Sequence, residues 1–117
     1  MTIDRQGLRQ TILSDAVDDH FGLYEVIWGL NTRYPHLPES EKAAVAIPVV
    51  SELLEQRLIE LYDSVWSPSS FRLLSHEAAA VAIRDPLSWR SPEELGGTYV
   101  SFVATEAGKR VYYQGKS

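Results

Sequence analysis

The sequence predicts an α+β domain in which three N-terminal helices are followed by a small antiparallel sheet with a helical insertion. Apolar residues recur at spacings of three and four through residues 39–55, which is the period of one helix face. From residue 59 the pattern changes to alternation, as in a strand with one buried side. A second alternating run, residues 99–104, begins about thirty residues after the first strand ends.

We expect all 117 residues to form one domain, with residues 67–97 as the insertion within the sheet. A chain of this length suits one core and is too short for two. The longest uncharged apolar run, residues 43–50, is far shorter than the ~20 residues of a membrane-spanning helix. The charged N-terminus shows no secretory signal, and the chain has no cysteine. We therefore expect a cytoplasmic protein without a membrane span.

The first two helices are predicted from their apolar faces. The first begins within residues 2–4 and ends around residues 18–20, and Gly22 is expected to close it in the left-handed conformation. The second covers residues 23–34, after which two prolines within residues 35–38 end the helical pattern. The expected buried positions are Leu8, Ile12, Leu13, Ala16 and Val17 in the first helix, and Leu23, Val26, Ile27 and Leu30 in the second.

The third helix, residues 39–55, leads almost directly into a strand over residues 59–66. Its apolar positions are Ala43, Ala46, Ile47, Val50, Leu53 and Leu54. Pro48 lies in its middle and is expected to bend the helix or to make it restart. Arg57 occupies the junction between helix and strand. If Arg57 adopts the left-handed conformation, the backbone strain lowers stability by ~1 kcal/mol relative to glycine.

The insertion is expected to contain its own helix over residues 76–84, stopped by the Asp-Pro pair at 85–86. The Ser-Pro-Glu-Glu run at 91–94 predicts one further turn. The last strand, residues 99–104, is followed by a short capped helix over residues 105–112. A structured insertion of this length in a compact domain is more often functional than not.

Two segments resemble the winged helix-turn-helix superfamily. Residues 53–61 resemble the junction between its third helix and first wing strand, although this chain lacks the glycine that family members usually carry there. Residues 99–112, with the run Thr-Glu-Ala-Gly, resemble the second wing strand and trailing helix of MarR-like and PadR-like regulators. The resemblance covers roughly residues 5–66 and 98–113. It implies a winged-helix-like domain with the helical insertion between its wing strands, a fold that serves DNA binding, protein binding and assembly alike.

The negative charge of the chain is concentrated in its helical half. The formal net charge is −5, and residues 1–60 carry five basic and ten acidic side chains, whereas residues 61–117 carry six of each. In a DNA-binding winged helix the third helix enters the major groove. In this chain the third helix and the junction after it carry two basic residues against four acidic ones, so this region would repel a polyanion.

No residue pattern indicates an active site, a metal site or a cofactor site. The three histidines are far apart, and none has the spacing of a metal site. The acidic residues at the end of the first helix lack a calcium-loop pattern. Neither a Gly-x-Ser-x-Gly elbow nor a phosphate-binding glycine loop is present. We expect that the protein is not an enzyme and uses no cofactor.

The function that we favour is a non-catalytic, acidic protein-binding module, in its sharpest form an immunity or antitoxin-type protein that neutralises a basic partner. For any single carboxylate, a solvated acidic surface with no ligand is an equally good interpretation. The aromatic residues of the sheet and insertion fit either a small second core or a partner-binding patch. The partner-binding candidates are Asp15, Asp18, Asp19, Glu39, Glu41, Glu52, Glu55, Trp66 and Trp89.

The alternative is a winged-helix DNA-binding transcriptional regulator, which the acidic third helix disfavours. Its phosphate contacts would come from Lys42, Arg72, Arg90, Lys109 and Arg110. A third class, a structural adaptor that uses the aromatic insertion, predicts that Trp89→Ala removes partner binding without unfolding the domain. We expect a monomer or a small homodimer, and a dimer would have to use the first helix or the insertion.

Overall fold

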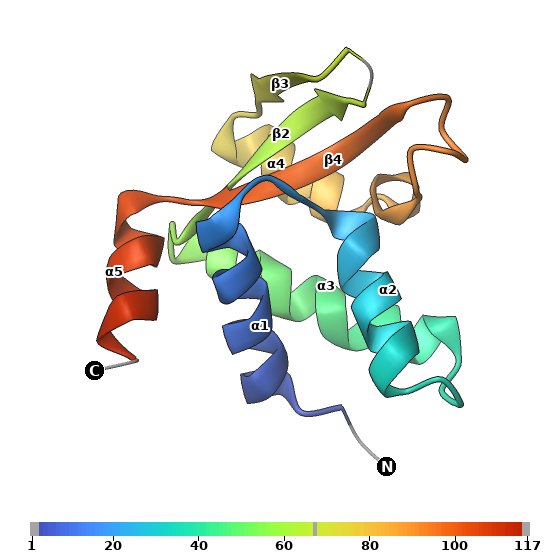
Figure 1. Ribbon diagram of the computed structural model, residues 1–117, viewed down its shortest axis with the longest axis horizontal. Coiled ribbons are helices and arrows are strands. Elements are labelled where there is room, and N and C mark those ends of the chain that lie inside the picture. Colours follow the sequence, from blue (N-terminus) through green and yellow to red (C-terminus); the bar gives the residue numbers. More distant parts are fainter. Residues whose placement is uncertain (1–2, 67, 116–117) are drawn as a thin grey trace.

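The computed structural model describes residues 3–66 and 68–115, which form five α-helices, one 3-10 helix and a four-stranded antiparallel sheet (Figure 1). The α+β prediction is confirmed. The helices are α1 (Arg5–Asp18), α2 (Leu23–Arg33), α3 (Glu39–Glu55), α4 (His76–Arg84), η1 (Pro86–Trp89, the 3-10 helix) and α5 (Glu106–Gln114). The strands are β1 (Phe21–Gly22), β2 (Ile59–Val65), β3 (Ser70–Leu73) and β4 (Thr98–Ala104). Among the described helices, none has the length and apolar character needed to cross a membrane.

The sheet has the strand order β1-β4-β2-β3. Strands β2 and β4 pair along their whole lengths, from Ile59 opposite Ala104 to Val65 opposite Thr98. On the far side of β4, the short strand β1 pairs Phe21 with Phe102. On the far side of β2, strand β3 is the other edge. The two long strands were predicted, whereas the two edge strands were not.

The core lies where α1, α2 and α3 pack together and against the sheet. All the predicted apolar positions of α2 are buried, as are those of α1 except Val17, which is partly buried. In α3 the buried side chains include the unpredicted Lys42 and Val49, whereas Ala43 and Ile47 are only partly buried. Phe102 of β4 is fully buried, and its ring contacts that of Phe21 edge to face at 5.9 Å.

Helix α3 runs through Pro48 without a break, so it does not restart there. At the junction with β2, Arg57 has a φ of 58°, so it does adopt the left-handed conformation, which the sequence had left open. The start of α5 is tied to this junction. The Thr105 side chain donates a hydrogen bond of 2.7 Å to the carbonyl of Arg57, and its amide donates one of 3.0 Å to Leu58. A Cβ at Gly108 would lie 2.0 Å from the Leu58 carbonyl oxygen, so this contact requires glycine.

The insertion packs back onto the domain. Helix α4 occupies the predicted residues, is capped by the Ser75 side chain and lies against α3 and β2. In Figure 1 it lies behind the sheet, with α1 in front of α3 below. The further turn predicted at residues 91–94 is present, because the amides of Glu94 and Leu95 both donate to the Ser91 carbonyl.

One local prediction is wrong. Gly22 has a φ of −74° and does not close α1 in the left-handed conformation. It belongs to β1 and directly precedes α2, where its amide donates a hydrogen bond of 2.7 Å to the Glu25 carboxylate. A Cβ at this position would lie 2.3 Å from the Tyr24 ring, so glycine is needed for space rather than for backbone conformation.

Candidate functional site

The exposed side of α3 carries carboxylates and no basic side chain. Glu41, Glu52 and Glu55 are exposed, and between them lie the exposed residues Ala44 and Pro48. Because an α-helix rises 1.5 Å per residue, this acidic stripe is about 21 Å long. Its neutral members have no group that could compensate the charge of the three glutamates. Glu39, also predicted, is exposed in the first turn of the same helix.

Lys42, the one basic residue within α3, is withdrawn from this surface. Its side chain is only 4% exposed, and its ammonium group donates a hydrogen bond of 2.7 Å to the Asn31 side chain of α2. An ammonium group held in this bond, on a lysine that is otherwise buried, is not free to contact a phosphate. The structure therefore removes Lys42 from the groove-facing residues of a nucleic-acid site.

Three further candidates for phosphate contacts are paired with carboxylates of the same chain. Arg72 forms an ion pair with Asp63, Arg90 Nη1 lies 2.9 Å from Glu94 Oε2, and Lys109 Nζ lies 3.7 Å from Glu106 Oε1. Such exposed pairs contribute little to stability, but each cancels the local positive charge. Arg110 is exposed on α5. The five basic residues thus form no continuous cationic strip.

A second acidic group lies at the C-terminal end of α1. Asp18 and Asp19 are exposed, while Asp15 is half-buried. Burial raises the pKa of Asp15, and the neighbouring charges of Asp18 and Glu25 raise it further, against a lowering by Arg33. The last turn of α1 has no basic residue to balance these charges. Because the C-terminal end of a helix is its negative pole, the carboxylates are held there at an electrostatic cost.

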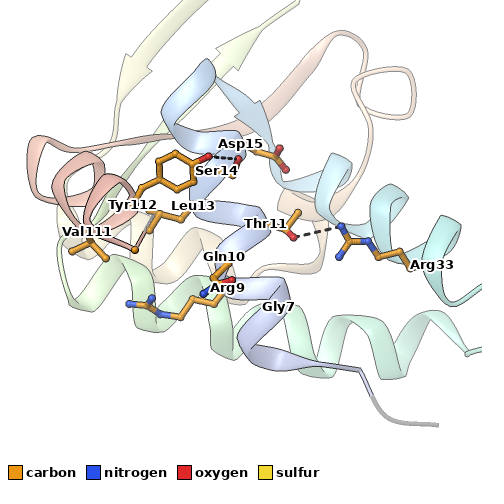
Figure 2. A pocket seen from close by; sticks show the side chains of 11 residues that line it. Gly7, Arg9, Gln10, Thr11, Leu13, Ser14, Asp15, Arg33, Val111 and Tyr112 are labelled. Carbon is orange, nitrogen blue, oxygen red and sulfur yellow. Dashed lines mark hydrogen bonds between the residues drawn. The ribbon is translucent and has the colours of Figure 1, made fainter. Parts of the chain in front are cut away.

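A groove of about 610 Å³ runs along α1, and Asp15 is one of the residues that line it (Figure 2). Figure 2 shows Tyr112 of α5 on one side of α1 and Arg33 of α2 on the other. Ser14 donates a hydrogen bond of 3.2 Å to the Tyr112 hydroxyl, and Arg33 donates one of 3.4 Å to the Thr11 hydroxyl. Asp15 thus lies at the edge of this groove, with the Arg33 guanidinium close enough to oppose the rise of its pKa.

The two predicted tryptophans have different environments. Trp66 is 54% exposed in the turn that follows β2. Trp89 is partly buried against the core, and its indole N–H donates a hydrogen bond of 2.8 Å to the Ile83 carbonyl. Trp66 is thus available to a partner, whereas Trp89 joins the insertion to the domain. Trp89→Ala is therefore expected to lower the stability of the domain as well as any partner binding.

Aromatic residues of the sheet, expected to form either a second core or a partner-binding patch, lie together on its outer face with a histidine that the sequence did not indicate. Tyr62 of β2 faces the same side as Leu73 and Phe71 of β3, and His20 reaches this face from the loop after α1. Tyr99 of β4 lies further along the same face. We call these five residues, His20, Tyr62, Phe71, Leu73 and Tyr99, the aromatic band. The alternation in β2 indicated the direction of Tyr62, but no sequence signal placed His20 beside it.

No family model, curated protein or solved structure matches this chain.

Proposed function

We propose that this protein is a non-catalytic, acidic protein-binding module that acts in the cytoplasm on a basic partner, as an immunity or antitoxin-type protein does. The observation that carries the proposal is the charge of α3. Its exposed stripe holds Glu41, Glu52 and Glu55, and its lysine is buried. Such a surface attracts a positively charged protein and accelerates its association.

The acidic residues at the helix ends support the proposal energetically. Asp18 closes α1 and Glu55 closes α3, and neither helix has a basic residue in its last turn. These charges are unfavourable in the free protein because they lie at the negative ends of the helix dipoles. A basic partner would remove this cost on binding, so the free energy released would add to the affinity.

A winged-helix-like arrangement is part of the proposal. It is supported by the direct passage of α3 into β2 through Arg57, and by the pairing of β2 with β4 along its full length. Strand β3 and helix α4 then belong to an insertion between these two strands. Because α4 packs on α3, alongside α1 and α2, only a stripe of α3 is left to contact a partner.

The regulator alternative has less support. A helix that enters the major groove presents basic and amide side chains to bases and phosphates. Here the exposed stripe presents carboxylates, and three of the other four basic candidates are ion-paired within the chain. The geometry favours a protein partner over a nucleic acid.

Co-purification with the products of the flanking genes tests the proposal. We expect one of these products to bind. The double variant Glu41→Lys, Glu52→Lys should bind it with an affinity at least tenfold lower. The matched control, Glu77→Lys with Glu106→Lys, makes the same change in net charge on α4 and α5 and should keep the partner. Circular dichroism would show that both variants fold. Equal binding by the two variants, or no basic partner at all, would contradict the proposal.

A further inference from the structure

The aromatic band is built around His20. Its imidazole stacks on the Phe71 ring with 3.9 Å between ring centroids and an angle of 17°, and it meets the Tyr62 ring edge to face at 4.7 Å. Beneath it, the hydroxyls of Ser64 and Ser101 bond to one another at 2.8 Å, and the latter lies 3.4 Å from His20 Nδ1. Two small serine side chains on adjacent strands make room for the ring.

The band remains accessible although its centre is ordered by these contacts. Phe71 is 43% exposed and Leu73 is 56% exposed. Towards α2, the Tyr99 ring contacts Tyr24 edge to face at 5.8 Å, and Tyr24 contacts the half-exposed Trp28 at 4.8 Å. The aromatic rings thus continue across the outer side of the sheet from β3 to α2. Contiguous exposed aromatic surface is a common feature of interaction sites.

The charges near this face are negative. Glu60 accepts a hydrogen bond of 3.2 Å from the Tyr62 hydroxyl. After burial, the charges of Glu25 and Asp19 raise the pKa of Tyr99, so these carboxylates lie near its ring. Neither β2 nor β4 contains a lysine or an arginine, and Arg72 of β3 pairs with Asp63, which alternates to the opposite face.

We propose that the aromatic band is a docking surface for an arginine- or lysine-bearing segment of a protein partner. The guanidinium or ammonium groups would lie over the rings of Phe71 and Tyr62, where an aromatic face attracts a cation. Asp19 and Glu60 would neutralise neighbouring basic residues of the same segment. The inference rests on the proposed function for the sign of the partner's charge. It adds a second contact surface, on the sheet rather than on α3, with a chemistry that glutamates alone cannot supply.

Chemical-shift mapping of the full chain with a hexa-arginine peptide tests this inference. We expect the largest amide shifts at residues 19–20, 60–62 and 71–73, and none of comparable size with a hexa-glutamate peptide. Phe71→Leu keeps an apolar side chain but removes the ring, and it should weaken peptide binding about threefold. The matched control is Tyr113→Leu, which removes an exposed ring from α5 and should leave the affinity unchanged.

A triple variant separates this inference from the proposed function. In Glu41→Gln, Glu52→Gln, Glu55→Gln the shifts at the aromatic band should persist, because the band does not depend on the α3 stripe. Shifts confined to α3 in the unaltered protein, or lost from the band in the triple variant, would overturn the inference and leave the acidic module standing. Equal loss of affinity in Phe71→Leu and Tyr113→Leu would also overturn it, as would preferential binding of single-stranded DNA at the band.

Discussion

The ammonium group of Lys42 donates a hydrogen bond of 2.7 Å to the side-chain oxygen of Asn31 across the α2–α3 interface. Asn31 is exposed, so the bond lies at the edge of this interface, whereas Lys42 itself is only 4% exposed. The exposed surface of α3 is left with Glu39, Glu41, Glu52 and Glu55 as its charged groups. Because Lys42 is buried, no basic side chain of α3 offsets these carboxylates, and the surface that the helix presents to a partner is uniformly acidic.

Lys42→Ala is expected to destabilise the domain by about 2 kcal/mol, because it removes buried methylene groups and a hydrogen bond from a charged donor. Urea denaturation followed by circular dichroism measures the change. Arg110→Ala, which truncates an exposed basic residue of α5, should change the free energy of unfolding by less than ~0.5 kcal/mol. Similar costs for the two variants would mean that Lys42 lies at the surface.

Asp15→Asn is expected to raise the melting temperature at pH 7. Folding raises the pKa of Asp15 above its ordinary value of 3.8, so the ionised carboxylate opposes folding at neutral pH. The carboxylate becomes protonated as the pH falls through its raised pKa, and it then no longer opposes folding. The advantage of the variant should therefore disappear below pH 3.8. Calorimetry at several pH values tests this, with Glu93→Gln as an exposed control. A variant less stable than the original protein at pH 7 would contradict it.

Gly108→Ala is expected to cost about 3 kcal/mol, since the added Cβ would meet the Leu58 carbonyl at 2.0 Å and push α5 off the α3–β2 junction. Gly29 is the matched control, because a Cβ there meets nothing within 4 Å in the middle of α2. Gly29→Ala should stabilise the domain by about 0.5–1 kcal/mol through helix propensity. Thermal unfolding measures the change in stability of each variant, which should be a loss at Gly108 and a gain at Gly29.

Arg57→Gly is expected to stabilise the domain by up to ~1 kcal/mol, because glycine adopts the observed φ of 58° without strain. Arg57→Val should be destabilising, since a β-branched residue tolerates a positive φ poorly. Chemical denaturation of the pair measures the strain at the junction. Equal stabilities of the glycine and valine variants would contradict strain at this residue.

Much of the fold could be predicted because its long elements are encoded locally. The cap at Ser75 and the stop at Asp85 and Pro86 gave the bounds of α4, and the alternating apolar pattern gave β2 and β4. Strands β1 and β3 have two and four residues, too few for a pattern of their own. They exist through pairing with β4 and β2, which is a long-range property.

The candidate site could be predicted less completely. The exposure of Glu41, Glu52 and Glu55 follows from the helical period. The burial of Lys42 had a sequence signal, since it lies on the same helical row as Ala46, Val49 and Leu53, but its charge argued for the surface. For the aromatic band, the sequence indicated aromatic residues on the sheet but not which of them come together. The band requires His20, in a loop, to meet residues that the register of two strand pairs brings together.

Titration of a fluorescent DNA duplex with the full chain, at salt concentrations from about 50 to 200 mM, tests the central claim most directly. The acidic surface of α3 predicts no duplex complex at protein concentrations of about 10 μM, even at the lowest salt, where a non-specific DNA-binding protein would bind. Tight duplex binding that weakens steeply as salt is added would show that this protein neutralises phosphates, and it would contradict the assignment of an acidic protein-binding module.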